Sequence, residues 1–148
     1  MRIILIGNYK PDGQESMDRF AAMLANGFRD NGHIVEIWKP KSIFGTLVNT
    51  TKSGVGKWFG YLDKWIIYSL VLSWRTQIKQ EYDKDVQFHI CDHSNSLYIS
   101  HLPSEQTVIT CHDVLAIRGA LGDADTYCPA SAFGKVLQRW ILINLVKA

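Results

Sequence analysis

Three polar clusters in the sequence contain side chains that could bind or transfer a small polar group. They are the segment Asn8 to Glu15, the segment Cys91 to Ser96, and the pair His112-Asp113. A histidine can polarise a hydroxyl or orient a reacting group. Carboxylates and amides, as in Asp92-His93-Ser94-Asn95, can hydrogen-bond to hydroxyl-rich ligands. These residue types predict a site for a polar small molecule.

Four short apolar runs have the length and composition of strands buried in a sheet. They cover residues 3–6, 33–38, 86–91 and 107–111. A continuous run of this length suits a strand that is covered on both faces. Helical segments separate the runs, so the sequence predicts an α/β fold with a Rossmann-like, doubly wound parallel sheet flanked by helices. Ligands of such sheets gather at the carboxyl ends of the strands, where the three polar clusters should converge.

Segments with helical periodicity lie between and after the predicted strands. They cover residues 17–28, 57–78 and 133–146, with one further turn at 97–101. Ser16 is the expected N-cap of the first helix, and the second is expected as one helix or a broken pair. Segments 46–60 and 116–130 have the composition of loops. Residues 1–148 should form a single domain, within which 44–80 is an aromatic and basic helical insertion.

Each candidate site also has a structural explanation that the sequence leaves open. Gly13 could let backbone amides approach a diphosphate at the N-terminus of the following helix, or it could only form the turn. His112 could act on a ligand or hydrogen-bond to a neighbouring loop. His89, Cys91 and His93 alternate and would share one face of an extended strand, which is conceivable for a metal site. No fourth ligand is specified, so packing in the core is favoured.

The basic residues are unevenly distributed along the chain. The net charge of the chain is only +2, which gives no argument for binding nucleic acid. Residues 39–79 nevertheless contain seven basic residues against Asp63 alone, a net charge of +6. With aromatic residues such as Trp58 and Trp65, this pattern predicts either contact with an anionic membrane surface or a helix packed on the sheet with solvated lysines.

The cysteines and the hydropathy pattern bear on the cellular compartment. Cys91, Cys111 and Cys128 form no CxxC pair, and two of them lie in apolar runs, which predicts buried thiols in a reducing compartment. The N-terminal apolar run is too short for a signal peptide, and no uncharged apolar run reaches the ~18 residues of a transmembrane helix. We therefore expect a cytoplasmic protein, with contact to the inner face of the cell membrane as an open alternative.

Several segments, taken together and in this order, resemble glycosyltransferase family 4. They are Met1–Ile6, Pro11–Gln14, Asn31–Val35, Phe88–His93, Val108–Asp113, Arg118–Gly122 and Phe133–Trp140. The family has the GT-B fold, in which two Rossmann-like domains face each other across a cleft. Its members transfer a sugar from a nucleotide donor to an acceptor, generally with retention and without an essential metal. The resemblance implies that residues 1–148 are the N-terminal, acceptor-binding domain.

The resemblance also implies roles for individual residues. Gly13 and Gln14 would approach the donor diphosphate, although the family often has a second glycine at the position of Gln14. His112 would be the catalytic residue beside the reacting sugar. The acceptor side would be lined by four polar residues: Asp92, His93, Asn95 and Asp113.

The partners that the resemblance implies are a nucleotide-sugar donor, a sugar or lipid-linked acceptor, and a C-terminal donor-binding domain that the sequence lacks. The nucleotide sugar is a substrate, so no cofactor is expected. Residues 1–148 alone should therefore be inactive. The alternative is a noncatalytic α/β module that recruits a partner or a membrane surface through its aromatic face at 58–74.

Overall fold

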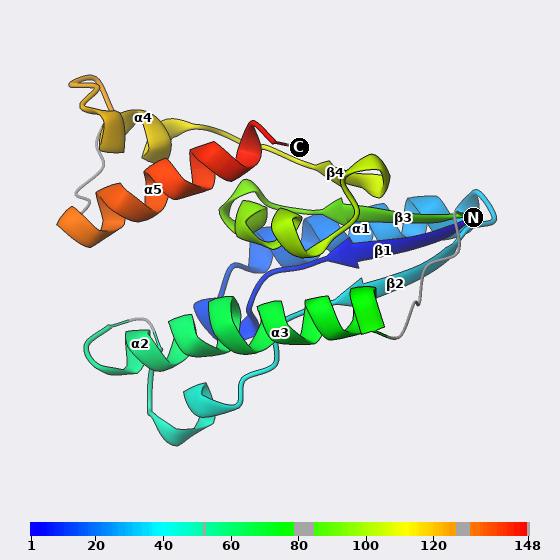
Figure 1. Cartoon of the computed structure of the whole chain (residues 1–148), viewed down its shortest axis with the longest axis horizontal. Coiled ribbons are helices and arrows are strands. Elements are labelled where there is room, and N and C mark those ends of the chain that lie inside the picture. Colours follow the sequence, from blue (N-terminus) through cyan, green and yellow to red (C-terminus); the bar gives the residue numbers. More distant parts are fainter. Residues whose placement is uncertain (52, 79–84, 127–130, 148) are drawn as a thin grey trace.

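The protein contains one parallel β-sheet of four strands (Figure 1). The structure is a computed structural model that describes residues 1–51, 53–78, 85–126 and 131–147. The strands are β1 (Arg2–Ile6), β2 (Ile34–Trp38), β3 (Val86–Ile90) and β4 (Thr107–Ile109), in the order β2-β1-β3-β4. All the pairings are parallel. The predicted α/β fold and all four predicted strands are confirmed, with ends that differ by one or two residues.

Helices cover both faces of the sheet. Helix α1 (Glu15–Asp30) packs its small residues, such as Ala21 and Ala25, against Ile3 and Leu5 on one face. The alternating residues of β1 point to the opposite face, where they contact a second cluster that includes Tyr68. Because β1 is apolar on both sides and central in the sheet, its residues Ile3–Ile6 are at most 2% exposed. The sheet is therefore covered in the doubly wound manner that the sequence predicts.

The second face is covered by one uninterrupted helical run from Gly56 to Ile78. It consists of α2 (Gly56–Tyr61), a π-helical stretch (Leu62–Ile67), α3 (Tyr68–Ser73) and a second π-helical stretch (Trp74–Ile78). The sequence leaves one helix or a broken pair open, and the structure has one run. Gly56 permits its start, since a Cβ there would lie 1.9 Å from the carbonyl oxygen of Thr50.

Shorter helices follow the strands and complete the domain. The 3-10 helices are Lys10–Asp12, Phe44–Leu47, His93–His101 and Ser104–Gln106. Helix α4 (Leu115–Leu121) packs against α5 (Ala132–Leu145), and α5 also contacts the 3-10 helix His93–His101. The hydroxyl of Ser96 donates to the carbonyl oxygen of Ile141 at 3.0 Å and links these two segments. Figure 1 shows α4 and α5 on the side of the molecule toward which the strands point.

Several local expectations were wrong. Gln14, not Ser16, is the N-cap residue of α1, because the helix already begins at Glu15. Part of the expected loop 116–130 is helix α4, whose Ile117 and Ala120 are buried, and residues 127–130 lie outside the described part. The expected loop 46–60 overlaps the 3-10 helix Phe44–Leu47 and the start of α2. Only part of each predicted loop is therefore irregular.

The cysteines and the aromatic residues of the segment 44–80 also differ in part from expectation. Cys91 is buried as predicted, but Cys111 is exposed because β4 already ends at Ile109. Cys128 lies outside the described residues. Trp65 packs against the core, whereas Trp58 is 60% exposed. Among the described helices, none combines the length and the apolar character needed to cross a membrane.

Candidate functional site

The carboxyl ends of β1 and β3 are joined by a buried network of polar side chains. The side-chain amide of Asn8 donates to the carboxylate of Asp92 at 2.7 Å, and the amide of Asn95 donates to the side-chain oxygen of Asn8, also at 2.7 Å. All three residues are at most 6% exposed. After β1 the chain enters α1 on one face, and after β3 it enters the 3-10 helix His93–His101 on the other. This is the switch point at which open α/β sheets bind ligands.

Asp92 is the centre of this network. Its carboxylate also accepts hydrogen bonds from the backbone N–H of Ser94 (3.2 Å) and from the Ser94 hydroxyl (2.6 Å). Burial alone would raise the pKa of Asp92, but the hydrogen bonds from Ser94 and Asn8 lower it below its ordinary value. Nδ1 of His93 lies 3.2 Å from the same carboxylate. Asp92 therefore stays ionised and forms the floor of the switch point, together with Asn95.

Gly13 and Gln14 lie on the exposed side of this network, at the N-terminus of α1. The side-chain oxygen of Gln14 accepts a hydrogen bond from the amide of Asn8. Gly13 has a left-handed backbone conformation, with φ of 69°, and its N–H donates to the carbonyl oxygen of Lys10. No side chain of the described residues caps α1. The positive end of the helix dipole therefore faces the predicted donor side.

His112 is held against the same edge by two contacts. Its Nε2 lies 2.9 Å from the backbone carbonyl oxygen of Cys91. A carbonyl oxygen only accepts, so the proton of the neutral ring belongs on Nε2 and Nδ1 is the acceptor. The ring also meets Phe20 of α1 edge-on, with centroids 4.7 Å apart. His112 is exposed, so this geometry presents an oriented imidazole at the rim of the switch point.

Asp113, the last of the predicted site residues, has a local role in the structure. Asp113 is exposed, and its carboxylate accepts the backbone N–H of Leu115 at 3.0 Å, at the start of α4. The hydrogen bonds above show that the three polar clusters converge, as predicted. The roles of Gly13, Gln14, Asp92, His93, Asn95, His112 and Asp113 toward a ligand stay predictions.

The alternating His89, Cys91 and His93 do not form one face of a strand. Strand β3 ends at Ile90, and His93 begins a 3-10 helix. The ring of His89 hydrogen-bonds to the hydroxyl of Thr110 at 2.7 Å, and burial raises the pKa of the Cys91 thiol to about 11. Among the described residues, no group of three or more His, Cys, Asp and Glu side chains could hold a metal ion.

A second polar centre, at Asp63, was missed by the sequence interpretation. Asp63 has no exposed surface and accepts hydrogen bonds from the Tyr9 hydroxyl (2.8 Å) and from the backbone N–H groups of three consecutive residues: Ile43 (3.0 Å), Phe44 (3.0 Å) and Gly45 (2.9 Å). It ties the segment after β2 to the helical run Gly56–Ile78. The available signal was that Asp63 is the sole acidic residue of the basic segment 39–79.

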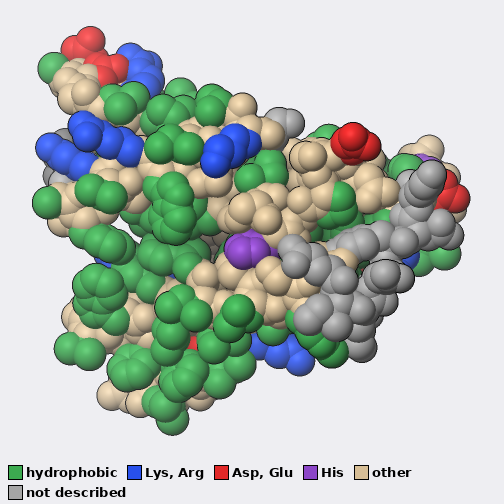
Figure 2. Space-filling model, in the orientation of Figure 1, with side chains coloured by type: hydrophobic (Ala, Val, Ile, Leu, Met, Phe, Trp, Pro, Cys, Tyr) green, Lys and Arg blue, Asp and Glu red, His purple; other side chains and the backbone are tan. Residues whose placement is uncertain are grey.

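An exposed aromatic surface lies where α2 approaches the start of α5. The ring of Trp58 is 5.3 Å from that of Phe133, and both line an apolar cavity of about 440 Å³. The neighbouring Trp140 is 54% exposed. Figure 2 shows hydrophobic side chains gathered at this end of the molecule. Part of the aromatic face of α5 is therefore open to solvent.

Comparison of the chain with protein-family models, with curated proteins and with solved structures finds no match. The function proposed below is therefore argued from the geometry of the switch point and from the resemblance of individual sequence segments that is described above.

Proposed function

We propose that residues 1–148 form the N-terminal, acceptor-side domain of a retaining GT-B glycosyltransferase of family 4. The observation that carries the proposal is the convergence of Asn8, Asp92 and His112 at the switch point of a doubly wound sheet. The resemblance of the segments that contain these residues to family 4 supports it further. In this proposal the donor is a nucleotide sugar, and the acceptor is a sugar or a lipid-linked molecule.

Each part of the switch point has a task in this proposal. Nδ1 of His112, the acceptor nitrogen of the neutral ring, accepts a hydrogen bond from a hydroxyl of the reacting sugar. The N-terminus of α1, with Gly13 and Gln14, faces the donor diphosphate. His93 and Asp113 contact the acceptor, while the ionised Asp92 keeps Asn8 and Asn95 in place. The other donor-binding residues belong to a second domain, so we expect no turnover from residues 1–148 alone.

The test is a transfer assay on the complete gene product that contains residues 1–148. We expect release of nucleoside diphosphate from at least one nucleotide sugar, and loss of kcat by about 100-fold or more in His112→Ala. His33→Ala is the matched control, because His33 precedes β2 at the opposite edge of the sheet and should leave kcat unchanged. Circular dichroism shows whether both variants fold. A wild-type rate in His112→Ala, or no nucleotide-sugar turnover by the complete protein, would refute the proposal.

A second candidate function is a noncatalytic module that recruits a partner or an anionic membrane surface. The observation in its favour is the exposed aromatic surface, which includes Trp58, Phe133 and Trp140, with the exposed bases Lys135 and Arg139 close by on α5. Sedimentation with anionic vesicles at low salt tests the membrane form of it. Replacement of Trp58 and Trp140 by serine should abolish binding, whereas His112→Ala should not. If the wild type does not bind the vesicles, recruitment to an anionic membrane is excluded as the function.

A further inference from the structure

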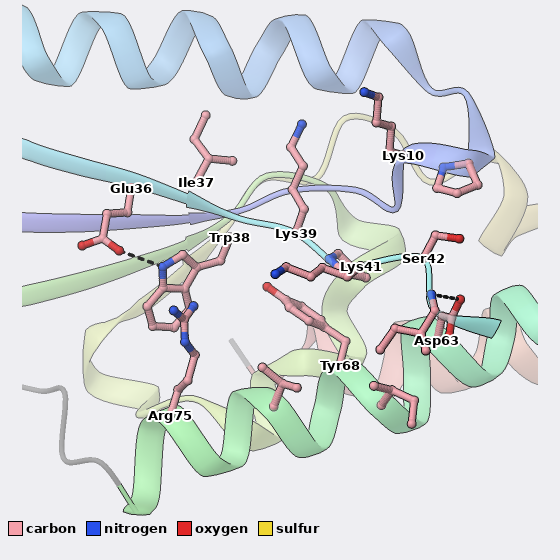
Figure 3. Close-up of a pocket in the computed structure, with 15 residues that line it drawn as sticks. Lys10, Glu36, Ile37, Trp38, Lys39, Lys41, Ser42, Asp63, Tyr68 and Arg75 are labelled. Carbon is pink, nitrogen blue, oxygen red and sulfur yellow. Dashed lines mark hydrogen bonds between the residues drawn. The ribbon is translucent and has the colours of Figure 1, made fainter. Parts of the chain in front are cut away.

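A groove of about 1110 Å³ lies between β2, with the segment that follows it, and the helical run Gly56–Ile78. One part of it, which we call the basic groove, is lined by Trp38, Lys41, Ile67, Tyr68, Val71 and Arg75. Figure 3 shows Lys41 and the hydroxyl end of Tyr68 in this part, whereas Lys10 and Lys39 point toward α1. The volume is sufficient for a small organic ligand. Hydrogen bonds and charges of the lining residues indicate which kind of ligand fits.

The acidic side chains of the groove are already saturated with donors. Asp63 is held by three backbone N–H groups and the Tyr9 hydroxyl. Glu36 accepts from the indole N–H of Trp38 and from the guanidinium of Arg2, each at 2.9 Å. Neither carboxylate forms an ion pair with Lys41, although Asp63 keeps its negative charge because its donors are neutral groups.

The positive charges of the groove are only partly compensated. Lys39 is paired with Asp18 of α1 at 2.6 Å. Lys41 is exposed and has no ion pair with any residue that the structure describes. The guanidinium of Arg75 lies over the Trp38 ring, 3.9 Å from its centroid. Its positive charge acts to lower the pKa of Tyr68, against the larger effect of burial. Arg75 also interacts electrostatically with Glu36. The groove as a whole is lined by four basic side chains against Glu36 and Asp63, a net charge of +2 that favours an anion.

A buried hydroxyl without an acceptor completes the site. Tyr68 is 5% exposed, and its hydroxyl has no hydrogen-bond partner among the described residues. Burial raises the pKa of Tyr68, so the group stays protonated and can donate. Tyr68 lines the groove, and Figure 3 shows its hydroxyl end directed into the basic groove, where neighbouring atoms cover the oxygen. A ligand oxygen that displaces the covering atoms would give this hydroxyl the acceptor that it lacks.

We propose that the basic groove binds the phosphate group of a small phosphate ester. Lys41 supplies the main positive charge, the hydroxyl of Tyr68 donates a hydrogen bond to a phosphate oxygen, and Arg75 adds positive charge. The apolar side chains of Trp38, Ile67 and Val71 contact the organic part of the ester. This binding does not depend on sugar transfer at the switch point, so either proposal can fail without the other.

Titration calorimetry of residues 1–148 at low salt tests the proposal, with hexyl phosphate as the probe. Lys41→Met should weaken binding about tenfold, and Tyr68→Phe about fivefold. Lys147→Met is the matched control, because Lys147 is exposed just after α5 and does not line the groove. Hexyl glucoside, which has the same chain but no charge, should bind far more weakly. Equal losses in Lys41→Met and Lys147→Met, or no binding of hexyl phosphate, would overturn the proposal.

Vesicles that contain phosphatidic acid distinguish a soluble ester from a lipid headgroup. If vesicles that contain phosphatidic acid bind the wild type but not the Lys41→Met variant, the phosphate belongs to a membrane lipid. If hexyl phosphate binds with the same dependence on Lys41 and these vesicles do not, the phosphate belongs to a soluble ester. Binding to vesicles that is unchanged in Lys41→Met, without binding of hexyl phosphate, counts against the proposal.

Discussion

The side-chain amide of Asn8 donates a 2.7 Å hydrogen bond to the carboxylate of Asp92 and so ties the end of β1 to the end of β3. Both side chains are 5% exposed, although 84 positions separate them in the chain. From these two strands the chain continues to opposite faces of the sheet, and this hydrogen bond therefore closes the floor of the switch point. The stability of this floor can be measured directly.

Asp92→Asn should lower the free energy of unfolding by about 1–3 kcal/mol. The variant loses the charge that accepts from Asn8 and Ser94, and its own amide group meets the amide of Asn8. Urea denaturation followed by circular dichroism measures the change. Asp113→Asn is the control, because Asp113 is exposed and asparagine can still accept the N–H of Leu115. Similar losses in the two variants would contradict the prediction.

Acid should destabilise the protein through Asp63 and Asp92. Burial alone would raise the pKa of each carboxyl, but the hydrogen bonds that each accepts bring it below the ordinary value of 3.8. The unfolded chain then binds more protons than the native state as the pH falls. The stabilisation is fully present above pH 3.8 and disappears as the pH drops through the lower native pKa values. Urea denaturation between neutral pH and strong acid should show a weaker acid dependence in Asp92→Asn.

Asp63→Asn should loosen the segment after β2. The carboxylate of Asp63 accepts the backbone N–H groups of Ile43, Phe44 and Gly45, so its loss should speed their hydrogen exchange roughly tenfold, equivalent to about 1.4 kcal/mol. Tyr9→Phe removes only the hydroxyl donor and should leave these amides largely protected. Unchanged exchange in Asp63→Asn would show that the helical run does not hold this segment through Asp63.

Tyr68→Phe should leave the free energy of unfolding unchanged or raise it by up to about 2 kcal/mol, because it removes a buried hydroxyl without a partner. The comparison is Tyr98→Phe, which removes a hydroxyl that donates to the carbonyl oxygen of Lys64 at 3.0 Å and should cost about 1 kcal/mol. Thermal and urea denaturation of the two variants check the difference. If Tyr68→Phe is destabilised as much as Tyr98→Phe, the hydroxyl of Tyr68 has a partner in solution.

The neutral ring of His112 should have its proton on Nε2, because this atom faces the carbonyl oxygen of Cys91. Nitrogen-15 NMR of the histidine side chains distinguishes the two tautomers. Assignment through His112→Gln identifies the signal. A proton on Nδ1 would mean that the ring does not donate to Cys91 in solution, and it would remove the basis for Nδ1 as the acceptor toward a sugar hydroxyl.

Local patterns in the sequence were sufficient to predict the strands and the edge of the sheet at which their carboxyl ends meet. The run Ile3–Ile6 is apolar at every position, which is typical of a strand covered on both faces, and the structure places it at the centre of the sheet. Helix α4 was missed because it has only seven residues, with Ile117 and Ala120 as its buried face. So short a segment shows little periodicity.

The sequence by itself determined the α/β class, the four strands and the convergence of Asn8, Asp92 and His112, because the carboxyl ends of parallel strands share one edge. Only the tertiary structure decided that Asp63 binds the segment after β2 and that the hydroxyl of Tyr68 lies buried in the groove of Lys41 and Arg75 without a partner among the described residues. The physical reason is that these relationships depend on how the helical run Gly56–Ile78 rotates against the sheet. Its packing is set by contacts with residues far away in the chain, such as Ile4, Ile6 and Tyr98. These contacts cannot be predicted from a local sequence pattern.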